Sequence, residues 1–181
     1  MTFNETILKG SFEINVNTFQ DERGWFTRTY CKNEFKNINH TKEWLQLNHS
    51  FTNKKGTIRG FHFQLQPFGE IKMVRCIAGS VYDVIVDVRK NSSTFLQWVG
   101  IELSASNRKM IYIPEGFAHG FQTLTDNCEL IYHHSEFYTA NEESGIKYDD
   151  PTLKVVWPLP LTNISERDKK HNFLKDNFIG I

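Results

Sequence analysis

The sequence predicts a single, mainly β domain that folds as a sandwich or barrel with a few short helices. Aromatic residues make up 14% of the chain, including 15 Phe. Runs of β-branched and aromatic residues recur at short intervals and outnumber segments with a helical period. The length of 181 residues suits one domain, and no repeat, low-complexity tract or linker divides it. We therefore expect one domain that spans residues 1–181.

The expected strands follow one another closely along the chain. They are Phe12–Phe19, Trp25–Tyr30, Trp44–Ser50, Thr57–Leu65, Lys72–Ile77, Val81–Arg89, Trp98–Leu103, Lys109–Ile113, His119–Thr125 and Glu129–His134. Ala78-Gly79-Ser80 and Pro114-Glu115-Gly116 are expected turns, because glycine tolerates a positive φ and proline fixes its own φ. Short helices are expected at Lys32–Lys36 and within Ser165–Lys170, the latter in a tail that contains prolines.

Composition and charge narrow the possible partners and location. Lys plus Arg number 21 and Asp plus Glu number 21, so no overall positive field attracts nucleic acid or an anionic membrane. The N-terminus does not resemble a signal peptide, and no segment has the apolar length of a membrane span. The three cysteines are far apart, which fits neither a disulfide framework nor a closely spaced zinc site. We expect a soluble cytoplasmic protein that binds neither nucleic acid nor membrane.

Alternation along two strands places candidate catalytic side chains on particular faces, because successive residues point in opposite directions. Within the strand at Thr57–Leu65, Phe61 is expected to share a face with Arg59, whereas His62 points the other way. In the last long strand, alternation allows Tyr132 to face the interior of a barrel.

His62 and Lys72 lie on segments predicted to be neighbouring strands. Removing a proton from a carbon beside a ketone needs a base near neutral pH and a cation or donor for the enolate oxygen. A histidine and a lysine can supply these two groups. The alternative is that His62 is a hydrogen-bonded core residue and Lys72 a surface residue.

Two further residues are candidates for binding. His119 lies between glycines and aromatic residues in Ile113–Phe121, where the backbone can approach a ligand closely. A tight turn with a packed histidine is the alternative. Arg23, within Asp21–Phe26, can hold a phosphate through its fork of donors, or it is a solvated arginine of a turn.

The histidine spacing does not indicate a metal site. The chain has seven histidines but no His-x-His pair, and the adjacent His133 and His134 point to opposite faces of a strand. We therefore expect no catalytic metal. The absence of a Gly-x-Ser-x-Gly motif, a glycine-rich phosphate loop and a dinucleotide fingerprint leaves serine hydrolases and the common nucleotide-binding folds without support.

Ordered motifs along nearly the whole chain resemble one family, the dTDP-4-dehydrorhamnose 3,5-epimerases. The matching segments are Asp21–Phe26, Gln46–Ser50, Ile58–Gln64, Lys72–Cys76, Gly79–Phe95, Ile113–Phe121, Ile131–Tyr138, Asp149–Pro151, Trp157–Pro158 and Ser165–Asp168. The resemblance implies a cupin-like jelly-roll β-barrel whose active site uses no metal or other cofactor. It also implies a homodimer in which the N-terminal strand region crosses to the partner, and a nucleotide-diphosphate sugar as substrate.

Carried over by position, the resemblance gives roles to individual residues of this chain. His62 would remove the proton beside the C4 ketone, with Asp168 as its carboxylate partner. Tyr132 would return a proton on the opposite face, and Lys72 would stabilise the enolate oxygen. The implied substrate-binding residues are Arg59 and His119 for the sugar or diphosphate, Arg23 for the diphosphate, Gln46 and Asn48 for the nucleotide, and Phe26 and Tyr138 for stacking on the base.

Two positions depart from the family pattern toward the nucleotide. Arg28 stands where the family commonly has Glu, and Leu47 stands where it has Asp. The first expectation is inversion of C3 and C5 of a dTDP-4-keto-6-deoxyhexose. Inversion at one centre, a CDP- or GDP-linked sugar, a nucleotide-sugar ketoisomerase and a non-catalytic sugar-nucleotide binding module remain alternatives.

Overall fold

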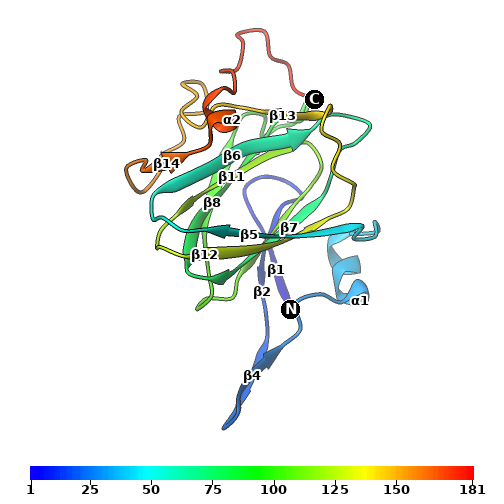
Figure 1. Ribbon diagram of the computed structural model, residues 1–181. Coiled ribbons are helices and arrows are strands. Elements are labelled where there is room, and N and C mark those ends of the chain that lie inside the picture. Colours follow the sequence, from blue (N-terminus) through cyan, green and yellow to red (C-terminus); the bar gives the residue numbers. More distant parts are fainter.

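The computed structural model describes residues 1–181 and confirms the mainly β fold with short helices (Figure 1). The strands are β1 (Thr2–Glu5), β2 (Phe12–Asn15), β3 (Thr18–Asp21), β4 (Gly24–Thr27), β5 (Gln46–Thr52), β6 (Thr57–Gln64), β7 (Lys72–Ala78), β8 (Ser80–Asp87), β9 (Trp98–Ser104), β10 (Met110–Ile113), β11 (Phe117–Thr123), β12 (Cys128–His134), β13 (Glu143–Gly145) and β14 (Asn163–Ile164). The helices are α1 (Lys32–Phe35), the 3-10 helix η1 (Lys36–Ile38) and α2 (Glu166–Lys169). None of them is long and apolar enough to span a membrane.

Two sheets face each other, and a two-stranded ribbon projects from them (Figure 1). The first sheet has the order β1-β2-β10-β7-β12-β5, and the second has the order β13-β6-β11-β8-β9, with β14 added beside β6. Most neighbours in a sheet are distant in the sequence, which is typical of a jelly roll. The long strands β5, β6, β7, β11 and β12 therefore meet around one interior.

Apolar side chains from both sheets fill the space between them. The main cluster has 12 buried residues, among them Val74, Ile85, Ile111, Phe117 and Leu130. Burying a side chain of this size stabilises the fold by roughly 1.5–3 kcal/mol relative to leaving it exposed. The alternation of the strands thus produces one packed interior, and the polar residues near one end of it are left to line a cavity.

The second sheet is buried on its outer face as well, because the C-terminal tail covers it. Val84 and Val86 of β8 belong to a second cluster with Phe61, and Trp157 and Phe178 of the tail pack against it. The rings of Phe61 and Trp157 stack with centroids 5.6 Å apart. A strand covered on both sides has a continuous apolar run, which explains the sequence of β8.

Strand β6 contains a bulge that changes which side chains share a face. The β6–β11 register shifts between Arg59 and His62, so that Gly60 and Phe61 oppose Gly120 alone. A Cβ on Gly60 would lie 2.6 Å from the Gly120 Cα, so this close approach requires glycine. The expectation from alternation that Arg59 and His62 point in opposite directions is wrong, because both line the same cavity.

The expected strand Phe12–Phe19 is in fact two strands. β2 pairs with β1 and β10 in the first sheet, whereas β3 leaves that sheet and pairs only with β4. The short strands β1, β13 and β14 were not expected either. They contain 4, 3 and 2 residues, which is too few for an alternating pattern to indicate them.

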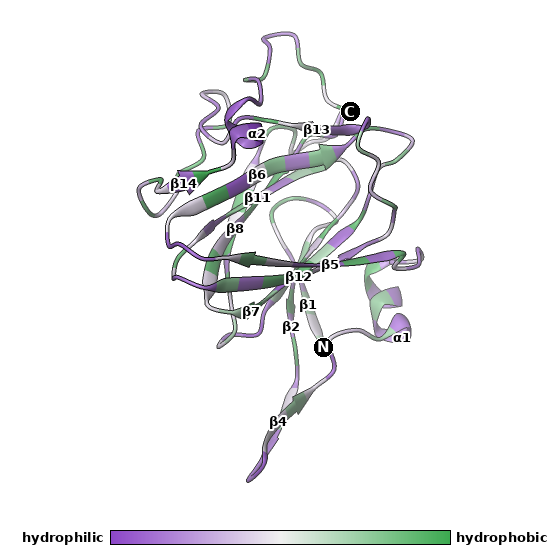
Figure 2. Ribbon diagram, viewed as in Figure 1, coloured by the Kyte–Doolittle hydropathy of each residue, from purple (hydrophilic) through white to green (hydrophobic).

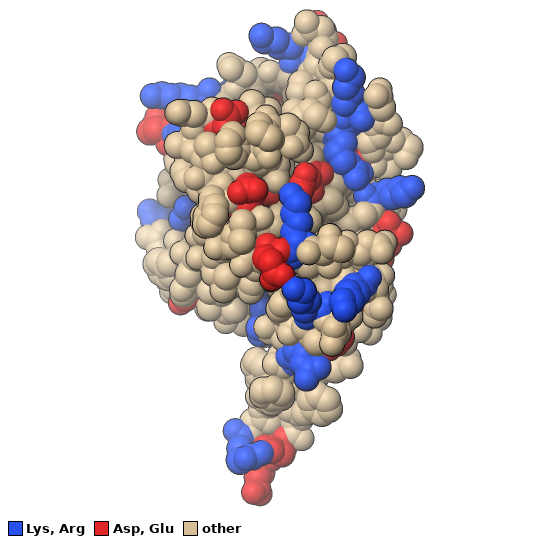
Figure 3. All heavy atoms as spheres, turned by 90° about the vertical axis from the view of Figure 1, so that its right-hand side faces the viewer, with Lys and Arg blue, Asp and Glu red and all other residues tan.

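Strands β3 and β4 form an arm that extends away from the barrel (Figure 1). Its apolar rings are not buried: Phe19 is 69% and Phe26 is 70% exposed, and hydrophobic residues are visible along the arm in Figure 2. Basic and acidic side chains gather at its tip (Figure 3), where the Arg23 guanidinium lies 2.5 Å from Asp21. The arm therefore presents aromatic rings and an arginine away from the core of its own chain.

Candidate active site

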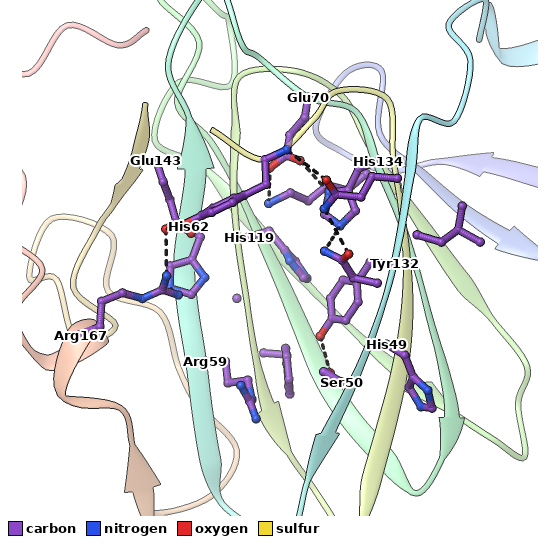
Figure 4. Close-up of a pocket in the computed structure, with 17 residues that line it drawn as sticks. His49, Ser50, Arg59, His62, Glu70, His119, Tyr132, His134, Glu143 and Arg167 are labelled. Atoms are coloured by element: carbon purple, nitrogen blue, oxygen red, sulfur yellow. Dashed lines mark hydrogen bonds and ion pairs between the residues drawn. The ribbon is translucent and has the colours of Figure 1, made fainter. Parts of the chain in front are cut away.

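A cavity of about 540 Å³ opens at the polar end of the barrel interior. Its walls come from β5, β6, β7, β11, β12 and the C-terminal part of the chain (Figure 4). The lining residues are Gln46, Leu47, Asn48, His49, Ser50, Arg59, His62, Glu70, Lys72, His119, Gly120, Phe121, Tyr132, His134, Tyr138, Glu143 and Arg167. Most of the residues singled out in the sequence are therefore brought together here.

His62 forms a pair with a buried carboxylate. Its Nε2 lies 2.8 Å from Oδ1 of Asp168, whose side chain is only 3% exposed. When Nε2 donates its proton to Asp168, Nδ1 is left as the nitrogen that can accept another proton. Arg167 Nη2 lies 3.2 Å from the same Nε2. Two donors cannot bond to each other, so Arg167 is a neighbouring charge in this tautomer.

The local sequence fixes the position of Asp168. Ser165 caps α2 by accepting a hydrogen bond from the Asp168 N–H at 3.0 Å, an arrangement typical of a serine three residues before an acidic one. The carboxylate then accepts the Gly60 N–H at 3.2 Å through Oδ2. The bulged strand β6 and the capped helix α2 together hold the carboxylate against the imidazole.

The pKa of Asp168 falls to about 2 in the folded protein. Burial alone would raise it, but the hydrogen bond and charge of His62, the Gly60 N–H and the charge of Arg167 outweigh burial. Glu70 follows the same pattern: burial is outweighed by its hydrogen bond to His134 and by the charge of Lys72, and its pKa also falls to about 2. Both carboxyl groups are thus ionised at neutral pH.

These two depressed pKa values predict a specific loss of stability in acid. The unfolded chain binds protons to Asp168 and Glu70 at higher pH than the folded chain, so their stabilisation is complete above about pH 5 and disappears as the pH falls toward 2. We expect each group to contribute on the order of 2 kcal/mol to this loss.

Urea unfolding at pH 6 and at pH 3 measures the effect. Asp168→Asn should show a smaller decrease in the free energy of unfolding between these two pH values than the wild type. An equal decrease in both proteins would mean that Asp168 is not the group that titrates.

Tyr132 lies across the cavity from His62, with His119 between them (Figure 4). Its hydroxyl is 3.0 Å from the Ser50 hydroxyl. Burial raises the pKa of Tyr132 above its ordinary value, and the hydrogen bond with Ser50 only partly offsets this. The phenol therefore keeps its proton at neutral pH and is available as a proton donor inside the cavity. The alternation that turned Tyr132 toward a barrel interior agrees with this position.

Lys72 reaches the cavity from the start of β7. Its Nζ lies 2.8 Å from Oε1 of Glu70, and the two side chains are only 11% and 10% exposed. The interpretation of Lys72 as a surface residue is therefore wrong. A cation held in this way can act on a developing negative charge without being screened by bulk water.

Two further hydrogen-bonding groups, His119 and Arg59, lie on the cavity wall. His119 Nε2 lies 2.8 Å from Oδ2 of Asp83, and both side chains are buried. Arg59 donates from Nε to the Thr52 hydroxyl and from Nη2 to the Phe51 carbonyl, each at 3.0 Å. These bonds tie Arg59 to β5 at the wall of the cavity.

The rim carries the amides implied for nucleotide binding. Gln46 Nε2 donates to Asn48 Oδ1 at 3.1 Å, and Gln46 Oε1 accepts the Tyr138 N–H at 3.2 Å. The Tyr138 hydroxyl donates to Glu143 at 3.0 Å. Glu143 also pairs with Arg167 at 2.8 Å, so the rim is a connected set of polar groups.

Arg23 and Phe26 do not reach the cavity of their own chain, because both lie on the projecting arm. The departures from the family pattern have different surroundings. Arg28 pairs with Glu34 at 3.0 Å, whereas Leu47 is exposed at the cavity rim.

Several lining residues were not identified from the sequence: Ser50, Glu70, His134, Glu143 and Arg167. Ser50 and His134 could have been found, since they alternate with Asn48 and Tyr132 on strands that were already expected. Glu70, Glu143 and Arg167 come from loops or short elements, where periodicity gives no direction.

A histidine from the tail, His171, also approaches His62. His62, Asp168 and His171 place one potential ligand atom each within 4.8 Å of one another. The histidine spacing used to predict a metal-free site does not detect this cluster, because His171 is remote in sequence. The Arg167 Nε, 3.5 Å from Asp168, puts a positive charge beside any cation there, which disfavours metal binding. The metal-free site therefore remains a prediction.

Comparison with known proteins places this fold and cavity in a family. The chain matches the family model of dTDP-4-dehydrorhamnose 3,5-epimerase over residues 5–176. It is 43% identical over 158 residues to the dTDP-4-dehydrorhamnose 3,5-epimerase of Shigella flexneri, which covers 87% of this chain and 86% of that protein.

Solved structures of related proteins support the same family assignment. The dTDP-4-dehydrorhamnose 3,5-epimerase of Bacillus anthracis with TDP and PPi bound superposes with a TM-score of 0.93 at 38% identity, covering 96% of this chain and 99% of that one. The dTDP-6-deoxy-D-glucose-3,5-epimerase of Legionella pneumophila in complex with dTDP-4-keto-L-rhamnose gives a TM-score of 0.91 at 34% identity, covering 95% and 92%. These matches confirm the cupin-like jelly roll, and the chain belongs to the dTDP-4-dehydrorhamnose 3,5-epimerase family of isomerases.

Proposed function

We propose that this epimerase inverts C3 and C5 of a dTDP-4-keto-6-deoxyhexose by removing a proton beside the ketone and returning one to the opposite face. The observation that carries this proposal is the placement of His62, backed by buried Asp168, and Tyr132 on opposite sides of one cavity (Figure 4). Two groups so placed can approach a flat enolate from its two faces.

His62 acts as the base in this proposal. Its Nδ1 takes the proton from carbon, and the electrons of the C–H bond pass into the enolate, which places negative charge on the C4 oxygen. Asp168 stabilises the imidazolium that forms, because the two groups are 2.8 Å apart and the carboxylate stays ionised. C3 and C5 both adjoin the C4 ketone, so one base and one enolate-stabilising group can serve both carbons.

Lys72 stabilises the enolate oxygen. The charge develops only after the proton has left, so a cation fixed beforehand lowers the barrier without needing to move. Tyr132 then delivers its proton from the other side, and solvent restores the proton of Tyr132 and removes that of His62. The raised pKa of Tyr132 ensures that the phenol is protonated when the enolate forms.

The remaining polar groups of the cavity hold the substrate. Arg59 and His119 bind the sugar or the diphosphate, and Gln46, Asn48 and Tyr138 bind the nucleotide. A dTDP-linked substrate is supported by the TDP and the dTDP-4-keto-L-rhamnose bound to the related enzymes of Bacillus anthracis and Legionella pneumophila. The free cysteines Cys31, Cys76 and Cys128 support a location in a reducing cytoplasm.

Proton NMR in D₂O with dTDP-4-keto-6-deoxyglucose tests the function. Loss of both the C3 and the C5 proton signals, followed by inverted product, is the expected result. Loss at one carbon would assign a single-centre epimerase, and a shifted ketone would assign a ketoisomerase. If neither signal is lost, repeating the experiment with CDP- and GDP-linked sugars separates a different nucleotide from a non-catalytic binding protein.

We also propose that the enzyme works as a homodimer in which the arm of β3 and β4 completes the cavity of the partner. The arm makes few contacts with the rest of its own chain. The rings of Phe19 and Phe26 are exposed, and the side chain of Arg23 is 85% exposed. Across a dimer, Arg23 would reach the diphosphate and Phe26 the base. Burying two such rings would offset part of the free-energy cost of association.

Mixing two inactive variants should then restore activity. Arg23→Ala is expected to lack a working arm and His62→Ala a working base. In a mixed dimer, the intact arm of one chain serves the intact cavity of the other, so random mixing should recover roughly a quarter of the wild-type sites. Turnover after co-refolding measures this, with each variant refolded alone as the control. Mixed dimers that form but stay inactive would contradict the crossing arm.

A further inference from the structure

The cavity contains a buried carboxylate that the proposed chemistry does not use. Glu70 lies two residues before Lys72, and its side chain is only 10% exposed. Its Oε1 lies 2.8 Å from Lys72 Nζ, and its Oε2 lies 2.6 Å from Nδ1 of His134 (Figure 4). A single carboxylate thus bridges the proposed enolate-stabilising cation and a histidine of β12.

The hydrogen bonds beyond His134 form a continuous chain with consistent donors and acceptors. With its proton on Nδ1, His134 donates to Glu70, and its Nε2 accepts from Asn48 Nδ2 at 3.3 Å. The Asn48 Oδ1 in turn accepts from Gln46 at 3.1 Å. Each side chain in this series of hydrogen bonds has one orientation that satisfies both of its neighbours. The series, which runs from Gln46 at the rim to Lys72, therefore fixes the position of each side chain in it.

His134 also contacts the proposed acid. It follows Tyr132 by two residues on β12, so both side chains are on the same face of the strand. The two rings stack with centroids 6.1 Å apart and an angle of 24° between their planes. The same histidine that bonds to Glu70 therefore limits where the Tyr132 ring can lie.

We propose that Glu70 and His134 are positioning residues, which hold the Lys72 ammonium against the C4 oxygen and keep the Tyr132 ring in place for proton delivery. This inference rests on the proposed epimerase function. A lysine side chain has a long flexible stem, and a charge that stabilises a transition state must be fixed before the reaction. The negative charge of Glu70 weakens the field of Lys72 at the enolate, so its benefit lies in placement.

The ionisation of Glu70 is consistent with this role. Burial favours the neutral acid, yet His134 and Lys72 together keep the pKa near 2, so both oxygens are acceptors at neutral pH. Glutamine has the same shape but only one acceptor. In either orientation of its amide, Glu70→Gln places a donor against Lys72 or against His134.

Glu70→Gln is expected to lower kcat by about 10- to 100-fold while KM and the affinity for dTDP change by less than about threefold. The rate of proton exchange with solvent at C3 and C5 and the rate of inversion at these carbons should fall by the same factor, because both reactions require the enolate that Lys72 stabilises. His134→Phe keeps a ring beside Tyr132 and should preserve the ratio of inversion to exchange. His134→Ala removes the ring and should lower inversion more than exchange.

The matched control is Glu129→Gln. Glu129 of β12 pairs with His49 of β5 at 2.7 Å, and these side chains are 36% and 52% exposed. Loss of this exposed carboxylate should leave kcat unchanged. Thermal unfolding checks that all variants are folded.

Two results would overturn the positioning role but leave the proposed epimerase function intact. One is a wild-type kcat in Glu70→Gln, and the other is an equal ratio of inversion to exchange in the two His134 variants. A wild type without exchange at any carbon would instead overturn the proposed function and, with it, this inference.

Discussion

Replacing His62 with alanine is expected to reduce proton exchange at both C3 and C5 by about 10²–10⁴-fold, the usual contribution of a positioned general base. One base is proposed for both carbons, so the two losses should be equal. Proton NMR in D₂O follows both signals in one experiment. Because alanine leaves Asp168 buried without its partner, His62→Asn, whose amide can still donate, is the second variant to measure.

The cavity supplies its own comparison for this result. His119 is also a buried histidine paired with a carboxylate, Asp83, at 2.8 Å, and it lies between His62 and Tyr132 (Figure 4). If His62→Ala still exchanged protons and His119→Ala did not, the base would be His119. Binding of dTDP should survive in His62→Ala, because the proposed nucleotide contacts lie on β5 and at Tyr138.

Tyr132→Phe is expected to separate exchange from inversion. The enolate can still form through His62 and Lys72, so deuterium should enter the substrate. Delivery of a proton to the opposite face should fall by about 10²–10³-fold, since phenylalanine has no acidic group. The measurement compares deuterium incorporation with the appearance of inverted product in the same sample.

Ser50→Ala is the milder companion of Tyr132→Phe. It removes the 3.0 Å hydrogen bond to the phenol but leaves the acid, so inversion should fall by less than in Tyr132→Phe. Inversion at the wild-type rate in Tyr132→Phe would eliminate Tyr132 as the acid. His119, whose ring centroid lies 6.4 Å from that of Tyr132, would then be the next residue to replace.

Much of the barrel could be predicted because its long strands alternate strongly. β6, β7, β8 and β12 lie close to their expected bounds, and Tyr132 faces the interior as its spacing indicates. β3 is different: Thr18 and Phe19 are expected to continue the strand that begins at Phe12, yet they leave that sheet. Only the pairing with β4 defines that strand, and pairing partners are not encoded in a local pattern.

The site was less predictable from local pattern than the fold. Alternation separated Arg59 from His62, whereas the bulge at Gly60 places both in one cavity. The positioning pair of Glu70 and His134 depends on a contact between a loop and β12, which no periodicity reveals. Asp168 was assigned only through resemblance to a family, since a contact across 106 positions leaves no mark on neighbouring residues.

The position of Asp168 in the C-terminal part of the chain determines when the proposed catalytic pair of His62 and Asp168 can form. Strands β5 to β12, which build the cavity walls, are synthesised before the segment that pairs with β6 through β14 and then enters α2. The carboxylate reaches His62 only when this segment has docked. The tail that contains it also covers the cluster of Phe61, Val84 and Val86 on the outer face of the second sheet. Completion of the core and polarisation of the proposed base therefore depend on the same part of the chain.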